Sequence, residues 1–224
     1  MKQPVSIHRR QRGQSLVEFC VVVPTFLFLL LVTLQFILIY RAKSALDYAT
    51  FQAARAGAVS GVDKGEMQYA LAGGLTPLFV TSPDIVEVGK KMAWVRATEV
   101  QVFSRIDVIS PTRAAFNEYR ERQYDGRYAL PNDSLAFRRA GVGASGVNVQ
   151  DANILKIKVT YNYPLIVPFA DFVIVGLSDL VSGGESYRPA LMMFPVGDHR
   201  RLPLESSAVV RMQSPIYESS RLAR

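Results

Sequence analysis

The hydrophobic pattern of the chain is dominated by one long apolar run near the N-terminus. It extends over 22 residues without a charge, from Phe19 to Tyr40, and sixteen of them are Leu, Ile, Val or Phe. As a helix the run is about 33 Å long, enough to cross the hydrocarbon core of a bilayer. A cleavable secretory signal has a shorter apolar core, of about 7–15 residues, and ends at small residues. We therefore predict a single transmembrane helix.

The residues after this run continue the helical pattern. A stripe of alanines follows at three- and four-residue spacing, namely Ala42, Ala45, Ala49, Ala53 and Ala56. Small residues on one face permit close approach of a neighbouring helix. The high helix propensity of alanine is the alternative explanation, and we favour the packing seam. We expect one helix over Gln14–Val59, with Gly57, Gly61 and Gly65 as its end.

The clearest strand of the chain runs from Leu155 to Tyr163, because apolar residues there alternate with polar ones. A helix over Thr112–Tyr124 rests on Ser110 and Pro111 as a cap and first-turn pair. The other predicted elements are a helix over Glu66–Leu75 ended by Pro77, strands over Ile85–Val88, Trp94–Phe103 and near Leu204–Gln213, a loop over 125–150, and a packed loop with a short helix over Leu165–Val181.

Strands and helices without regular βαβ alternation predict an α+β fold. In this fold a long N-terminal transmembrane helix is followed by a small antiparallel sheet packed with short helices. The chain then divides into a basic leader (1–13), a transmembrane and extended helix (14–60) and an exported α+β domain (61–224).

The distribution of charge gives the orientation of the helix. The formal net charge is +7, and four cations with no acid lie in the first thirteen residues, namely Lys2, Arg9, Arg10 and Arg12. Such a tail favours the cytoplasm, although Arg41 and Lys43 on the far side weaken the asymmetry. Without the four cations the charge is 7 − 4 = +3, spread among mixed signs. This pattern argues against a nucleic-acid partner.

The reactive residues of the chain form no catalytic set. Cys20 is the only cysteine, so the exported part has neither an intramolecular disulfide nor a Cys–His pair. The sequence of Gly141–Gly146 matches GxGxxG, but it neither follows a strand nor opens a helix, so it is predicted to be a loop. His8 lies in the leader and His199 in a turn-like setting. We expect no enzyme, no cofactor and no metal site.

The segment Arg12-Gly13-Gln14-Ser15-Leu16-Val17-Glu18-Phe19 resembles a prepilin processing site. The rest of the chain resembles the TadE family of minor pilins (pseudopilins) of Tad pili, in three features: a proline inside the apolar run (Pro24), the Ala/Arg-rich helix continuation over 41–60, and two C-terminal segments over 154–168 and 202–215. TadF and TadG relatives share the N-terminal pattern, and TadE is preferred over them. The aromatic residue is Phe19 where major pilins usually have Tyr, and the chain is longer than theirs, so the resemblance implies a minor subunit.

The resemblance implies a cut between Gly13 and Gln14 by a prepilin peptidase. It further implies that Glu18 neutralises the N-terminal amine of a neighbouring subunit during assembly, with Phe19 beside it in the recognition motif. The expected protein lies in a bacterial inner membrane with its C-terminal domain in the periplasm, and it can enter an extracellular pilus. Its expected partners are the peptidase, other Tad pilins or pseudopilins, the inner-membrane Tad platform and membrane lipid.

The expected role is in pilus assembly, adhesion or biofilm formation. Two alternatives remain open from the sequence. One is an uncleaved, membrane-anchored periplasmic assembly factor. The other is an anchored enzyme or ligand-binding domain, which would show a convergent polar pocket.

Overall fold

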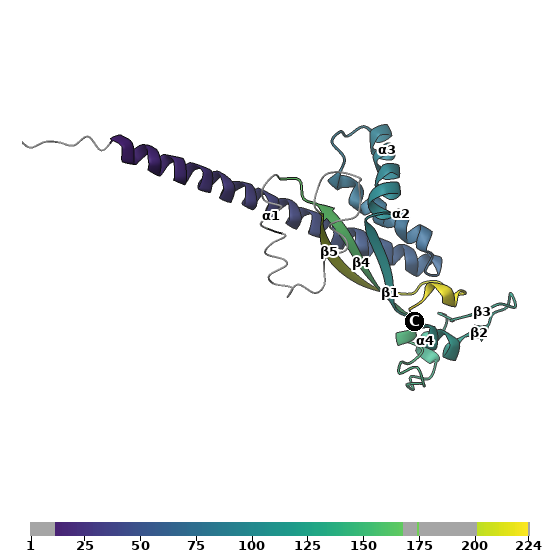
Figure 1. Ribbon diagram of the computed structural model, residues 1–224. Coiled ribbons are helices and arrows are strands. Elements are labelled where there is room, and N and C mark those ends of the chain that lie inside the picture. Colours follow the sequence, from purple (N-terminus) through teal and green to yellow (C-terminus); the bar gives the residue numbers. More distant parts are fainter. Residues whose placement is uncertain (1–11, 168–173, 175–200, 224) are drawn as a thin grey trace, which may run out of the picture.

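The computed structural model describes residues 12–167, 174 and 201–223, and one long helix dominates it. Helix α1 (Arg12–Ser60) is 49 residues long and contains Pro24 without a break. Figure 1 shows the N-terminal half of α1 projecting alone and the C-terminal half embedded in a folded domain. The predicted helix over Gln14–Val59 is therefore confirmed, and the α+β fold class is confirmed as well.

The end of α1 is set by Gly61. Gly61 and the next residue, Val62, both have positive φ angles, of 66° and 64°. The Val62 N–H donates to the Gly57 carbonyl at 2.8 Å, a bond typical of a helix end with a left-handed residue. Gly57 lies inside α1, so only one of the three predicted stop glycines stands at the helix end.

Helix α2 (Lys64–Leu75) turns back along α1 and confirms the predicted helix, which begins two residues earlier than expected. Asp63 caps it, because its carboxylate accepts the N–H groups of Gly65 and Glu66 at 2.8 and 3.2 Å. Gly65 thus belongs to the first turn of α2 and does not end α1.

The strands predicted over Ile85–Val88 and Trp94–Phe103 are wrong. The chain instead forms helix α3 (Ile85–Val95), continued by a π-helical turn (Arg96–Val100). Asp84 caps α3 by accepting the Val86 N–H at 3.1 Å. The β-branched and aromatic residues favour a strand locally, but tertiary packing outweighs such weak preferences.

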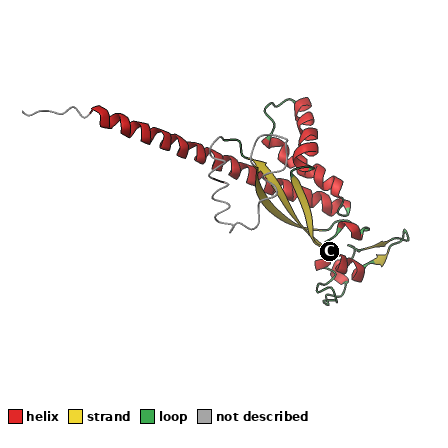
Figure 2. Cartoon of the chain, in the orientation of Figure 1, coloured by secondary structure: helices red, strands yellow, loops and turns green. Residues whose placement is uncertain are grey.

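Three antiparallel strands form the sheet in the order β1–β4–β5 (Figure 2). They are β1 (Ser104–Ser110), β4 (Ile154–Pro164) and β5 (Arg201–Arg211). Alternate side chains of β4, from Leu155 to Tyr163, are buried, as the sequence pattern predicts. The predicted C-terminal strand is confirmed, although it begins three residues earlier and ends two residues earlier than expected. The buried face of the sheet shares one core with α1 and α2.

A small lobe lies at the end of the domain farthest from the N-terminus (Figure 1). It contains α4 (Arg113–Tyr119) and a two-stranded hairpin, β2 (Glu121–Arg122) with β3 (Tyr128–Ala129). The helix predicted over Thr112–Tyr124 is therefore too long, because strand pairing begins at Glu121. Its cap is Thr112, whose hydroxyl accepts the Ala115 N–H at 3.2 Å, and the predicted Ser110–Pro111 cap is wrong.

The rest of the lobe is mainly irregular, as predicted for 125–150. Of the predicted packed loop over Leu165–Val181, only residues 165–167 and Ile174 lie within the described residues. His8 and His199 lie outside them.

Candidate functional site on the N-terminal helix

The N-terminal half of α1 exposes an apolar surface all around the helix. From Leu16 to Tyr40 most side chains are exposed, with Phe19 at 66% and Tyr40 at 76% of their full area. A soluble domain rarely exposes so large an apolar surface. Among the described residues, this is the one helix long and apolar enough to cross a membrane. We conclude that α1 is a membrane-anchor candidate.

The predicted processing residues lie at the start of this helix. The backbone of Gly13 and Gln14 forms the first turn of α1, which begins at Arg12. Glu18 and Phe19 come next on exposed positions. Glu18 is four residues after Gln14, so it lies about 6 Å farther along the axis and on the same face. The helix thus brings the predicted cut site and the predicted counter-ion together.

The domain begins to cover α1 inside the charge-free run. The residues of α1 that face the domain repeat at four- and three-residue intervals, namely Gln35, Ile39, Ala42, Leu46, Ala49 and Ala53. Gln35 is fully buried, and its side-chain carbonyl accepts the Val167 N–H at 2.8 Å. Its Nε2 group has no hydrogen-bond partner. One continuous stripe therefore connects the apolar half of the helix to the domain core.

The alanine stripe packs against the chain's own elements. Ala42, Ala49 and Ala53 are fully buried, whereas Ala45 and Ala56 are half-buried. The closest approach is between Ala49 and Gly74 of α2. A Cβ atom added to Gly74 would lie 2.5 Å from the Ala49 Cα and 2.6 Å from its Cβ. The small residues therefore allow α2 to contact α1 within one chain.

A buried polar cluster, which the sequence reasoning missed, joins the π-helical turn to the sheet. Glu99 is 3% exposed and accepts the Tyr161 hydroxyl at 2.8 Å. Arg201 donates to both carboxylate oxygens of Glu99, at 2.9 and 3.2 Å. The Arg201 guanidinium also lies 3.3 Å from the centre of the Phe103 ring. Burial, and then the neighbouring Glu99 carboxylate, raise the pKa of Tyr161 well above its ordinary value. Tyr161 therefore donates a proton at every physiological pH.

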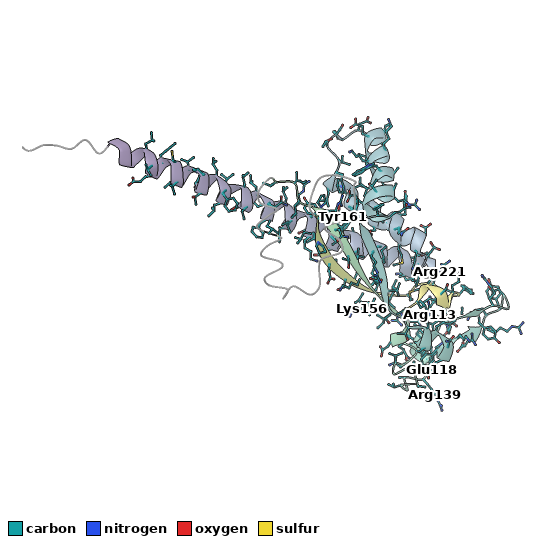
Figure 3. The ribbon with its side chains drawn as sticks, in the orientation of Figure 1. Arg113, Glu118, Arg139, Lys156, Tyr161 and Arg221 are labelled. Atoms are coloured by element: carbon teal, nitrogen blue, oxygen red, sulfur yellow. The ribbon has the colours of Figure 1, made fainter. Side chains whose placement is uncertain are left out.

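Figure 3 places Tyr161 on β4, at the end of the sheet nearer the N-terminal half of α1. The only sequence signal for the cluster was an acid, Glu99, within an otherwise apolar stretch.

The glycine-rich loop binds a carboxylate of its own chain. Glu118 of α4 accepts the N–H groups of Ala144 and Ser145 at 2.7 and 2.8 Å (Glu118 is labelled in Figure 3). A Cβ atom on Gly143 would overlap the Glu118 carboxylate. Segment 141–146 is therefore a loop, as predicted, and Glu118 already occupies the amides that a phosphate would need.

The comparison with protein families identifies the N-terminal part of the chain. Residues 13–55 match the family model described as TadE-like protein. The N-terminal segment is TadE-like. The chain has no match among the curated proteins or among the solved structures at the threshold that was applied.

The TadE-like segment has a clear structural meaning. It begins at Gly13 and covers the exposed apolar half of α1 together with most of the buried alanine stripe. It spans 55 − 13 + 1 = 43 of the 224 residues and ends before α2 and the sheet. A TadE-like segment indicates a protein associated with Tad pili.

Within residues 12–167, 174 and 201–223, no three His, Cys, Asp or Glu side chains lie close enough together to hold a metal ion. The carboxylates in the buried cluster and in the glycine-rich loop are both occupied by donors of the chain itself.

Proposed function

We propose that this TadE-like protein is a minor pilin or pseudopilin of a Tad-type pilus and secretion system. The observation that carries the proposal is the single rigid helix α1. Its exposed apolar half suits a membrane or a bundle of other pilin helices, and its other half is built into the core of a folded domain. A subunit of this shape can leave the bilayer as one body, because the helix and the domain share one packing stripe.

The proposal includes removal of the basic leader by a prepilin peptidase. Hydrolysis of the Gly13–Gln14 peptide consumes one water and leaves a carboxylate on Gly13 and a cationic amine on Gln14. Glycine leaves room for an extended backbone in the protease site. The bond lies in the first turn of α1, where amide groups lack helical partners, so local unwinding costs little.

In the assembled state, Glu18 is proposed to pair with the new amine of a neighbouring subunit. A charge on a membrane-depth helix is costly and is tolerated when it has a partner. Because opposite charges attract far more strongly in a low-dielectric environment than in water, this pairing favours entry of the subunit into a helix bundle.

Processing is tested by measuring the N-terminal mass of the chain with and without the cognate peptidase. The mature chain is expected to begin at Gln14 and to contain 224 − 13 = 211 residues. Gly13→Leu is expected to block the cut, whereas Gly141→Leu is the matched control, because Gly141 has open space around it. A native chain that keeps Met1 or Lys2 in piliated cells would instead support an uncleaved, membrane-anchored assembly factor.

The role of Glu18 is tested by piliation. Glu18→Ala is expected to leave the chain in the membrane and to abolish its contribution to pilus formation. Glu87→Ala, which removes an exposed acid from α3, serves as the control and should have no effect. Normal piliation in the Glu18→Ala strain would rule out the assembly role of this carboxylate.

We propose a structural role rather than an enzymatic one. The proposed partners are the peptidase, other Tad pilins or pseudopilins and the inner-membrane platform. The basic tail supports a cytoplasmic N-terminus and a periplasmic domain.

A further inference from the structure

The part of the domain nearest to the membrane-anchor half of α1 is the turn after β4. This turn, residues 164–167, lies against α1, because the Val167 N–H donates to the Gln35 side chain at 2.8 Å. In Figure 1, β4 points back along α1, and the green coil after it reaches the helix. Leu165 is 2% exposed, whereas Ile166 is 55% exposed. An exposed isoleucine therefore stands at the level of Gln35.

The level of Gln35 is given by the helix itself. The charge-free run ends at Tyr40, five residues or about 7.5 Å beyond Gln35. Measured from the other side, Gln35 is 35 − 18 = 17 residues after Glu18, which corresponds to about 26 Å. The hydrocarbon core of a bilayer is about 30 Å thick, and a tilted helix would place Gln35 deeper still. With Glu18 at one boundary, Gln35 lies inside the opposite one.

The chemistry of the turn matches this depth. Each polar backbone group in hydrocarbon needs a partner, and the Val167 N–H has one in the Gln35 carbonyl. Gln35, the polar residue of this part of the run, is covered by the domain and does not face lipid. The neighbouring exposed side chains of α1, Phe36, Ile37 and Tyr40, are apolar or amphipathic.

We propose that the domain is seated in the outer leaflet through the 164–167 turn, with Ile166 inserted among lipid chains. Gln35 fixes the turn at that depth by accepting the Val167 N–H. The partner is the lipid surface itself, because α1 carries the turn into the bilayer. The domain is therefore held against the membrane rather than displayed on a stalk. This inference rests on insertion of α1 in a membrane.

The test uses the full chain in bilayer nanodiscs of phosphatidylethanolamine and phosphatidylglycerol. Cys20→Ser removes the only native cysteine, and single cysteines are then introduced for a nitroxide label. Ile166→Cys is the test position. Val209→Cys is the matched control, because Val209 is 58% exposed on the outer face of β5. Leu27→Cys, at a position 52% exposed in the middle of the apolar run, reports on the anchor.

Relaxation by oxygen and by a water-soluble nickel chelate measures the depth of each label. The ratio of oxygen to nickel accessibility is expected to be several-fold higher at 166 than at 209, and higher still at 27. Equal ratios at 166 and 209 with a high ratio at 27 would overturn the seated turn while leaving the anchor intact. A low ratio at 27 would overturn the anchor and the seat together.

A second variant isolates the hydrogen bond. Gln35→Leu keeps the helix apolar but removes the acceptor of the Val167 N–H. In this background the label at 166 is expected to become more mobile and more accessible to nickel. An unchanged depth and mobility would show that Gln35 does not position the turn.

Discussion

The contact between α1 and α2 makes a sharp prediction, because two adjacent glycines of α2 have opposite surroundings. A Cβ atom on Gly74 would lie 2.5 Å from the Ala49 Cα of α1, a distance at which backbone must move. A Cβ atom on Gly73 would meet only the flexible end of Met92, at 3.4 Å. Gly74→Ala should therefore separate the two helices, whereas Gly73→Ala should be accommodated.

The magnitudes can be worked out from this geometry. Both substitutions replace glycine inside a helix, which by itself stabilises by about 0.5–1 kcal/mol. Gly74→Ala adds an overpacking cost of about 1–3 kcal/mol, at the upper end because the clash involves backbone. Since the propensity gain cancels in the comparison, the two variants should differ by about the overpacking cost alone. For a domain of this size each kcal/mol corresponds to about 2–4 °C in Tm.

The assay is thermal and urea unfolding of the full chain in detergent micelles, monitored by circular dichroism and by fluorescence of the only tryptophan, Trp94. Gly73→Ala should equal or exceed the parent chain in stability, and Gly74→Ala should fall below it. If the two variants unfold together, the close approach of α2 to Ala49 does not exist as described.

Two further substitutions test the buried contacts of the domain. Glu99→Ala should cost about 3–5 kcal/mol, because it leaves the Arg201 guanidinium buried without its acceptor. Glu205→Ala removes an exposed pair with Lys158 and should cost less than about 1 kcal/mol. A similar loss for both in urea unfolding would contradict the burial argument. Gly143→Ala should speed amide hydrogen exchange of Ala144 and Ser145 with little change in global stability, whereas Gly141→Ala should leave exchange unchanged.

The sequence predicted best the elements whose signals are local. The long apolar run and the strict alternation over Leu155–Tyr163 each carry their own period, so α1 and β4 appear where expected. The segment 85–103 failed because its helical stripe includes a buried acid, Glu99. The burial of Glu99 depends on Arg201, which is 102 residues away in the chain. No local pattern reveals such a partner.

The candidate site divides in the same way. The spacing of Gln14 and Glu18 could be read from the chain, because both lie on one helix. The partner of the alanine stripe could not, since it depends on the return of α2 and on Gly74. Likewise, the GxGxxG pattern required Glu118, a residue 25 positions before Gly143, to explain its glycine.

These contacts limit how α1 can meet other subunits. The face that carries Ala42, Ala49 and Ala53 is buried inside the chain, so another helix cannot pack there without displacing α2 or the sheet. Toward the N-terminus of Gln35 the helix is open on nearly all sides. In the C-terminal half, the exposed positions include Tyr48 and Phe51, at 58% and 46% of their full area. Contacts between subunits along the domain half of α1 must therefore use this aromatic face, and the apolar half remains free to form the helix bundle.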